Sequence, residues 1–174
     1  MSVVLPQFCF AVRLLSNSFC PIALKQRASH TMPENLPDIE SSIPHRSSML
    51  LVDEVISVDE KQIVCKKSFR NDEHFFDGHY PGNPIVPGVI LCECAAQSGA
   101  ILISTLMSDA QGTPVLTRMD NIRFKRIVKP GETVEITVKL DDVVSTAYYL
   151  TAQVRCEGKV AARLSFACTL AKSE

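Results

Sequence analysis

Residues 89–107 form one uninterrupted apolar run, VILCECAAQSGAILISTLM, which contains no proline and many residues with high helix propensity. Pro87 and Gly88 stand just before it, where a first helical turn would begin and where a missing proline N–H costs nothing. Because apolar residues occur on every side of this predicted helix, we expect it to be buried all round. Its length approaches that of a membrane span. The small residues near its middle, its one glutamate and the strand-like sequence that follows favour a buried core helix instead.

The loop in front of this helix, residues 77–88, is rich in glycine and proline and carries one histidine, His79. Proline fixes a backbone φ and glycine permits tight turns, so we expect the loop to be held and the imidazole to have a defined direction. The unpaired N–H groups of the first helical turn point toward whatever lies in front of the helix. Together with the helix dipole they predict a site for an oxyanion.

One carboxylate, Glu93, lies about a turn and a half inside the helix, and Gln97 lies four residues further on the same face. A carboxylate in apolar surroundings is costly to ionise, so its pKa is predicted to be raised, which suits a general acid near neutral pH. The structural alternative is a core carboxylate that is satisfied by local hydrogen bonds. Taken alone, this residue leaves both interpretations open.

The rest of the chain has the pattern of β-strands. Residues 50–69 contain two short runs rich in Val and Ile and predict a hairpin. Four later runs alternate in polarity or carry β-branched and aromatic residues, namely 115–128, 132–144, 147–159 and 160–171. Turns are predicted at 129–132, 141–145 and 157–159. Two strands, one helix and about four strands predict an α+β fold in which the helix covers one face of an antiparallel sheet.

Composition excludes several classes of function. The net charge of −1 and the pI near 6.4 give no general attraction to nucleic acid or to anionic membranes. Seven cysteines do not form an obvious disulfide framework, which indicates reduced thiols and a cytoplasmic compartment. Cys92 and Cys94 are too close together for a zinc pair, so no metal is predicted. His45, in the sequence PHR, has two interpretations: a catalytic residue, or one that shapes the start of the first strand, and the second is favoured.

The chain is predicted to divide into an N-terminal extension, residues 1–36, and one domain, residues 37–174. The extension has several serines, three basic residues and no acidic residue before Glu34. This composition is similar to that of a mitochondrial or plastid transit peptide, which would change the predicted location. A poorly ordered tail, or a true start at Met32, is the alternative.

The run GHYPGNPIVPGVILCECAAQ resembles the signature of the (3R)-hydroxyacyl-acyl-carrier-protein dehydratases of the FabZ type. In that family GHFPGxPxxPG precedes a helix that bears E-A-x-A-Q. The spacing of fourteen residues from His79 to Glu93 is kept, and Tyr80 stands where phenylalanine is usual. Residues 43–55 and 119–136 resemble flanking segments of the family, so the resemblance covers roughly 37–171.

The resemblance implies a hotdog fold, an antiparallel sheet wrapped around one long helix. It implies dehydration of (3R)-3-hydroxyacyl-acyl-carrier-protein to the trans-2-enoyl product in type II fatty-acid biosynthesis, with no metal or organic cofactor. His79 is expected to take the C2 proton, and Glu93 is expected to protonate the leaving hydroxyl. The residues expected to contact the substrate are Gly88, whose N–H would hold the thioester carbonyl, Gln97, Tyr80 and Pro87.

The resemblance also implies partners. The family places its site at a homodimer interface, with the histidine of one subunit facing the carboxylate of the other, and dimers often form hexamers. The basic cluster within 118–129 has two interpretations: a charged edge strand, or a docking surface for acidic acyl carrier protein. The candidates for docking are Arg123, Lys125 and Arg126. Two rival functions remain open at this point, an acyl-thioester hydrolase and a non-catalytic acyl-thioester-binding regulator on the same fold.

Overall fold

The computed structural model describes residues 36–107 and 112–171, which belong to one compact unit, Thr31–Glu174. Nearly all of the predicted extension, including the possible transit peptide at 1–31, lies outside the described residues. Within them, six strands form a single sheet in which every neighbouring pair is antiparallel and the order is β1-β2-β4-β5-β6-β3. The strands are β1 (Glu54–Val58), β2 (Gln62–Ser68), β3 (Thr113–Phe124), β4 (Thr133–Val144), β5 (Ala147–Cys156) and β6 (Lys159–Ala171).

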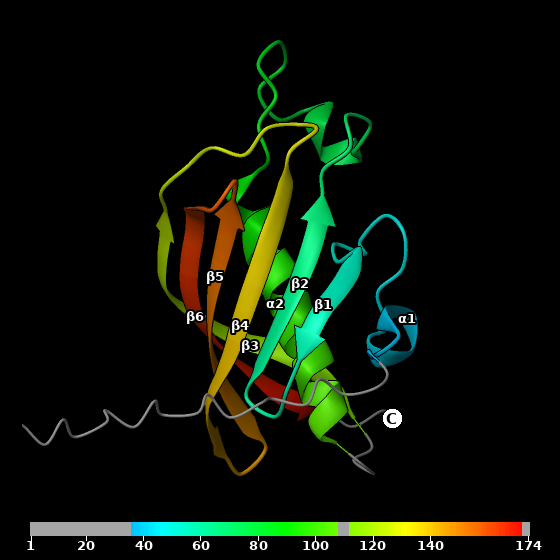
Figure 1. The fold of residues 1–174 in the computed structure, drawn as a ribbon, viewed down its shortest axis with the longest axis vertical. Coiled ribbons are helices and arrows are strands. Elements are labelled where there is room, and N and C mark those ends of the chain that lie inside the picture. The colour runs from blue at the N-terminus through cyan, green and yellow to red at the C-terminus, as the bar shows by residue number, and fades with distance from the viewer. Residues whose placement is uncertain (1–35, 108–111, 172–174) are drawn as a thin grey trace, which may run out of the picture. The chain divides into compact units, whose positions relative to one another are not determined.

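The long helix α2 (Gly88–Leu106) lies across one face of this sheet, and Figure 1 shows the strands curving around it. Its buried side chains, such as Ile101 and Leu102, pack with the inward-facing residues of β2 and β4. The helix approaches β6 closely at Gly99, where an added Cβ would lie 2.7 Å from the ring of Phe166. The arrangement confirms the predicted α+β hotdog fold.

Alternation of polarity along the strands explains why only one face of the sheet is covered. In β4 the side chains of Val134, Ile136 and Val138 are fully buried, whereas the residues between them point outward. The same period of two runs through β2 and β5. Burial of the apolar face against α2 therefore sets the register of the central strands, because a slip of one residue would turn the apolar set to solvent.

The helix boundaries agree with the prediction of 89–107 to within one residue. The expectation of burial all round is wrong for the first turn, because Val89 is 72% exposed where the helix begins. Among the described helices, α2 alone is long and apolar enough to cross a membrane, and 67% of that stretch is buried inside the fold. Burial by the sheet is the better account of its hydropathy.

Two short helices and one long hairpin differ from the prediction. The turn α1 (Ile39–Ser42) is capped by Asp38, whose carboxylate accepts from the Ser41 amide at 2.9 Å, and η1 (His74–Phe76) follows β2. Neither was predicted. The turn predicted at 141–145 is wrong in extent, because β4 continues to Val144 through a bulge and reverses at Ser145, which has a φ of 57°.

Candidate functional site

The loop that carries His79 is attached to the fold near its end, and the segment before η1 that leads into it is also held. In that segment, Glu73 lies 3.3 Å from the buried ammonium group of Lys67, which also lies 3.0 Å from Asp53. Near the end of the loop, the Val86 amide donates to the carbonyl of Val128 at 2.8 Å. The loop is thus bound to the segment after β3, in agreement with the prediction that it is held. Figure 1 shows the loop extending beyond the sheet, between η1 and α2.

The imidazole of His79 makes one hydrogen bond within the described part of the chain. Its Nδ1 atom lies 3.0 Å from the backbone oxygen of Ile85. A carbonyl can only accept, so Nδ1 carries the hydrogen and Nε2 is left with a free lone pair in the neutral ring. The ring of Tyr80 packs edge-on against it, with ring centroids 4.7 Å apart. Tyr80 has a φ of 56°, a left-handed conformation that is unusual for a residue other than glycine.

A cavity of about 570 Å³ brings the loop and the beginning of α2 together. Its lining includes His79 and three of the four residues predicted to contact a substrate, Tyr80, Pro87 and Gly88. The side chain of Phe124, from the end of β3, forms another part of the wall. The loop and the helix start therefore share one void, as their positions in the sequence indicated.

The start of α2 leaves backbone donors unused. Pro87 precedes the first turn, and its carbonyl accepts from the Ile90 amide at 3.0 Å. Among the described residues, no hydrogen bond uses the amide of Gly88 or of Val89. A Cβ atom at Gly88 would lie 2.7 Å from the ring of Phe124, so only glycine allows this approach. The predicted site for an oxyanion has its donors in place.

The carboxylate Glu93 is held by Gln97 from the next turn of the helix. Gln97 is 1% exposed, and its Nε2 donates to Glu93 Oε1 at 2.9 Å and to the Met49 carbonyl at 2.7 Å. Its Oε1 accepts from the Leu51 amide at 2.8 Å. Glu93 itself keeps 28% of its side chain exposed, so its tip is not enclosed by apolar groups as the sequence suggested.

A second histidine, His45, contacts the same carboxylate. Its Nε2 atom lies 3.5 Å from Glu93 Oε1. The sequence favoured a role for His45 at the start of the first strand over a catalytic one. His45 and Glu93 are 48 residues apart, so no local pattern indicates that they meet. The contact arises because the segment before β1 lies on α2, where Met49 and Leu51 bind Gln97.

The cavity of about 570 Å³ that contains His79 is not lined by the other predicted catalytic residue, Glu93 of the same chain.

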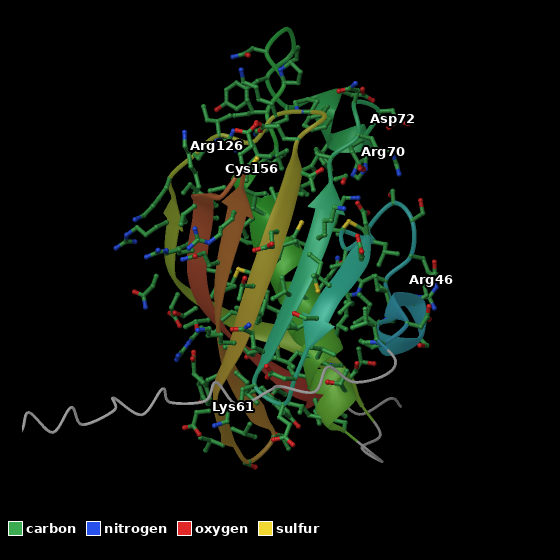
Figure 2. The ribbon with its side chains drawn as sticks, in the orientation of Figure 1. Arg46, Lys61, Arg70, Asp72, Arg126 and Cys156 are labelled. Carbon is green, nitrogen blue, oxygen red and sulfur yellow. The ribbon has the colours of Figure 1, made fainter. Side chains whose placement is uncertain are left out.

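The basic residues predicted for docking lie in different surroundings. Arg126 is bound by Glu132 at 2.8 Å and by Glu157 at 2.9 Å, and Figure 2 shows it beside Cys156 at the end of β5.

Arg123 and Lys125 lie instead in a second hollow, of about 720 Å³, on the outer face of the sheet. Three more cations contribute to it, Lys139, Arg155 and Arg163, and no carboxylate does. Arg123 and Arg163 are directly opposite each other across the β3–β6 pair. Like charges in this position destabilise a sheet, so the hollow concentrates positive charge that the fold does not require.

No group of three or more metal-binding side chains occurs among the residues that the structure describes. The cysteines within those residues are buried and free. Burial raises the pKa of the Cys65 thiol to about 11, against a smaller opposing effect of a hydrogen bond with Ser98. Burial, with a contribution from Glu93, also raises the pKa of Cys168 to about 11. Such thiols are poor nucleophiles.

The chain matches a family described as ApeI-like, ApeI dehydratase, over residues 55–164. It is 35% identical over 143 residues to the 3-hydroxyacyl-acyl-carrier-protein dehydratase FabZ of Syntrophobacter fumaroxidans, which is 80% of this chain and 97% of that protein. It is 39% identical over 117 residues to FabZ of Oenococcus oeni, which is 65% of this chain and 84% of that protein.

Two solved structures show the same fold at low identity. The dehydratase heterocomplex ApeI:P from Xenorhabdus doucetiae matches with a TM-score of 0.70 and 16% identity, over 80% of this chain and 94% of that chain. The PaaI protein of E. coli matches with a TM-score of 0.55 and 15% identity, over 67% of this chain and 81% of that chain. At these identities the likeness establishes the architecture and no more.

Proposed function

The chain belongs to the FabZ family of 3-hydroxyacyl-acyl-carrier-protein dehydratases, and we propose that it converts (3R)-3-hydroxyacyl thioesters to trans-2-enoyl thioesters in fatty-acid biosynthesis. His79 is the base and Glu93 is the acid. The observation that carries this proposal is the imidazole of His79. Its Nδ1 is bound by the Ile85 carbonyl, which leaves Nε2 as the unprotonated nitrogen, and the ring lines the same cavity as Gly88.

The reaction is balanced by two proton transfers. Nε2 of His79 takes the proton from C2, and the electron pair of that C–H bond forms the double bond to C3. The C3–O bond breaks with its electron pair on oxygen, which receives the proton of Glu93 and leaves as water. The Gly88 amide donates to the thioester oxygen, where negative charge grows as the C2 proton departs. Return of the proton from His79 to Glu93 restores the starting state.

A second copy of the chain brings the acid to the base. Support comes from the cavity of His79, to which Glu93 of the same chain does not contribute, and from the free edge of the sheet. The edge strand β3 is twelve residues long and unpaired on one side within the described chain. Large apolar side chains are exposed along and near it, at Val115, Leu116, Phe124 and Ile127. Pairing of two such edges would cover these residues and form a homodimer.

Hydration of a crotonyl thioester tests the roles of the two residues. His79→Ala and Glu93→Gln should each abolish turnover in folded protein. Mixing the two inactive variants tests the interface. If each site takes His79 from one subunit and Glu93 from the other, equal mixing should restore about a quarter of wild-type activity, since half of the dimers then contain one intact site of two. Full activity in either single variant would refute that residue's role, and no recovery on mixing would refute the shared site.

The outer hollow is our choice for the carrier-protein surface. Arg123 and Lys125 lie in it, and Lys125 also lines the cavity of His79, so the two hollows are neighbours. An acidic carrier bound there would place its thioester arm near the base. Arg126 contributes less because two carboxylates already bind it. Arg163→Glu should raise KM at least tenfold for a carrier-bound substrate and leave KM for a coenzyme A thioester unchanged.

The charge reversal needs a control of equal charge change. Lys61→Glu provides it, because Lys61 lies in the turn between β1 and β2, outside the lining of the hollow. Equal KM values for the two thioesters in Arg163→Glu would rule out this docking surface. Loss of activity toward both substrates would point to damage in the fold, which far-UV circular dichroism would reveal.

The rival functions have weaker support. A thioester hydrolase on this fold would release free thiol, and a thiol-trapping assay run beside the enoyl absorbance separates the two activities. A non-catalytic acyl-thioester-binding regulator would need a nucleic-acid surface, which gel shift with and without acyl thioester would detect. We place the enzyme in the cytoplasm on the strength of its reduced thiols. The trimer of dimers, and a mitochondrial or plastid location if residues 1–31 are a transit peptide, stay predictions.

A further inference from the structure

The two oxygens of the Glu93 carboxyl group have different surroundings. Gln97 fixes the difference, because its own amide can be oriented in only one way. The Leu51 amide must donate, so it binds Gln97 Oε1, and the Met49 carbonyl must accept, so it binds Nε2. Gln97 Nε2 is therefore the group that faces Glu93, and it donates to Oε1 at 2.9 Å. Among the described residues, Oε2 has no hydrogen bond.

His45 approaches the same oxygen from the other side. Its Nε2 atom lies 3.5 Å from Glu93 Oε1, and its Nδ1 atom is buried without a hydrogen-bond partner in the described structure. A buried N–H with no acceptor is unfavourable, so Nδ1 is the unprotonated nitrogen and Nε2 carries the hydrogen. The neutral ring thus presents a donor to Glu93. Contacts of this kind are often long in a free enzyme and shorten when substrate binds.

Arg46 holds the backbone that carries this ring. Its guanidinium donates to the carbonyls of Ile43 at 2.9 Å, His45 at 2.7 Å and Glu40 at 2.8 Å. Figure 2 shows Arg46 beside α1, on the surface of the segment that precedes β1. Three carbonyls bound by one planar group leave the His45 backbone little freedom, so the imidazole is directed at α2 by the local structure.

We propose that His45 and Gln97 form a two-donor clamp on Glu93 Oε1, which leaves Oε2 to carry the acid proton. The inference rests on the proposed role of Glu93. The carbonyl-type oxygen of a carboxylic acid is its better acceptor, so two donors at Oε1 direct the proton to Oε2. When Oε2 gives that proton to the leaving hydroxyl, Glu93 becomes a carboxylate. The donors of the clamp then stabilise the charge that forms. His45 is a positioning residue that acts through Glu93.

A pair of substitutions at His45 distinguishes the effect of its hydrogen-bond donor from the effect of its ring shape. His45→Phe keeps a planar ring and removes the donor, and it should lower kcat about tenfold to a hundredfold with little change in KM. His45→Gln places an amide N–H near the position of Nε2, and it should keep kcat within about threefold of the wild type. His74→Phe is the matched control. His74 is an exposed histidine on η1, and its loss should leave kcat unchanged.

The pH dependence provides a readout that a purely structural role would not change. Loss of a donor to the carboxylate disfavours the charged form of Glu93, so the alkaline limb of the kcat profile should move to higher pH in His45→Phe and stay in place in His45→Gln. Equal losses in both variants with unmoved profiles, or a kcat of His45→Phe within twofold of wild type, would overturn the clamp. Activity in Glu93→Gln would instead refute the proposed acid, so the two failures are distinguishable.

Discussion

Replacement of Gln97 by leucine tests whether one buried amide joins the segment before β1 to the central helix. Gln97→Leu keeps the volume of the side chain and removes hydrogen bonds to Leu51, Met49 and Glu93. The amide of Leu51 then remains buried without a partner, because Leu51 is 1% exposed. The other two groups belong to partly exposed residues, since Met49 is 46% exposed and the Glu93 side chain is 28% exposed.

The expected loss follows from this difference between the three groups. A buried donor that loses its acceptor costs about 1–3 kcal/mol, whereas groups that water can reach lose about 0.5–1 kcal/mol each. We therefore expect the free energy of unfolding to fall by about 2–5 kcal/mol. Urea unfolding, followed by far-UV circular dichroism, measures this quantity directly, and kcat should fall as well because Glu93 loses a donor.

The matched control is Gln153→Leu, the same substitution on the outward face of β5. Gln153 lines the outer hollow, and its side chain makes no hydrogen bond within the described chain. Its replacement should change the unfolding free energy by less than about 0.5 kcal/mol. A loss in Gln97→Leu that is no greater than the loss in Gln153→Leu would show that the three hydrogen bonds do not stabilise the contact, and the clamp on Glu93 would lose its anchor.

Three further changes have calculable effects on stability. Lys67→Met leaves the buried Glu73 without its ion-pair partner, and we expect a loss of about 3–5 kcal/mol in urea unfolding. Gly99→Ala places a methyl group 2.7 Å from the Phe166 ring, and overpacking should cost about 1–3 kcal/mol by the same measurement. Stability should also fall as pH rises from 9 to 11, because the raised pKa of Cys65 keeps its thiol protonated in the folded chain while the unfolded thiol ionises.

Each of these changes has its own control. Lys66→Met removes a neighbouring cation whose ion pair with Glu54 is exposed, so it should cost less than about 1 kcal/mol. Phe166→Leu, combined with Gly99→Ala, should recover part of the loss if the ring is the obstacle. Cys65→Ala should reduce the alkaline decline by about 1.4 kcal/mol per pH unit within the window, and an unchanged slope would show that the thiol is not responsible.

Local sequence was sufficient for the elements whose cause is local. The run from Val89 onward contains nothing that interrupts a helix, and Pro87 with Gly88 marks its start, so the boundaries of α2 were predicted to within one residue. The glycines and prolines of the loop predicted that the His79 ring is held, but not that the Ile85 carbonyl binds it. Alternation of apolar residues predicted the strands of the sheet but not their lengths. The polar pair at 141–142 predicted a turn, whereas β4 continues past it through a bulge.

Contacts between segments that are far apart in the sequence could not be predicted from local patterns. The approach of His45 to Glu93 depends on how the segment before β1 crosses α2, and no periodicity in either segment encodes that crossing. The binding of Arg126 by Glu132 and Glu157 is similar, since three residues from separate turns meet only in the folded chain. From the sequence, Arg126 belonged to a basic cluster that could be either a charged edge strand or a docking surface.

The unequal edges of the sheet affect how readily a newly synthesised chain aggregates. One edge is the five-residue β1, which is too short to pair readily with a strand of another chain. The other edge is the twelve-residue β3, along which apolar side chains are exposed. Such a border is a template for runaway polymerisation until something covers it. Pairing of β3 with β3 of a second copy would therefore prevent aggregation at this edge and complete the proposed active site in the same step.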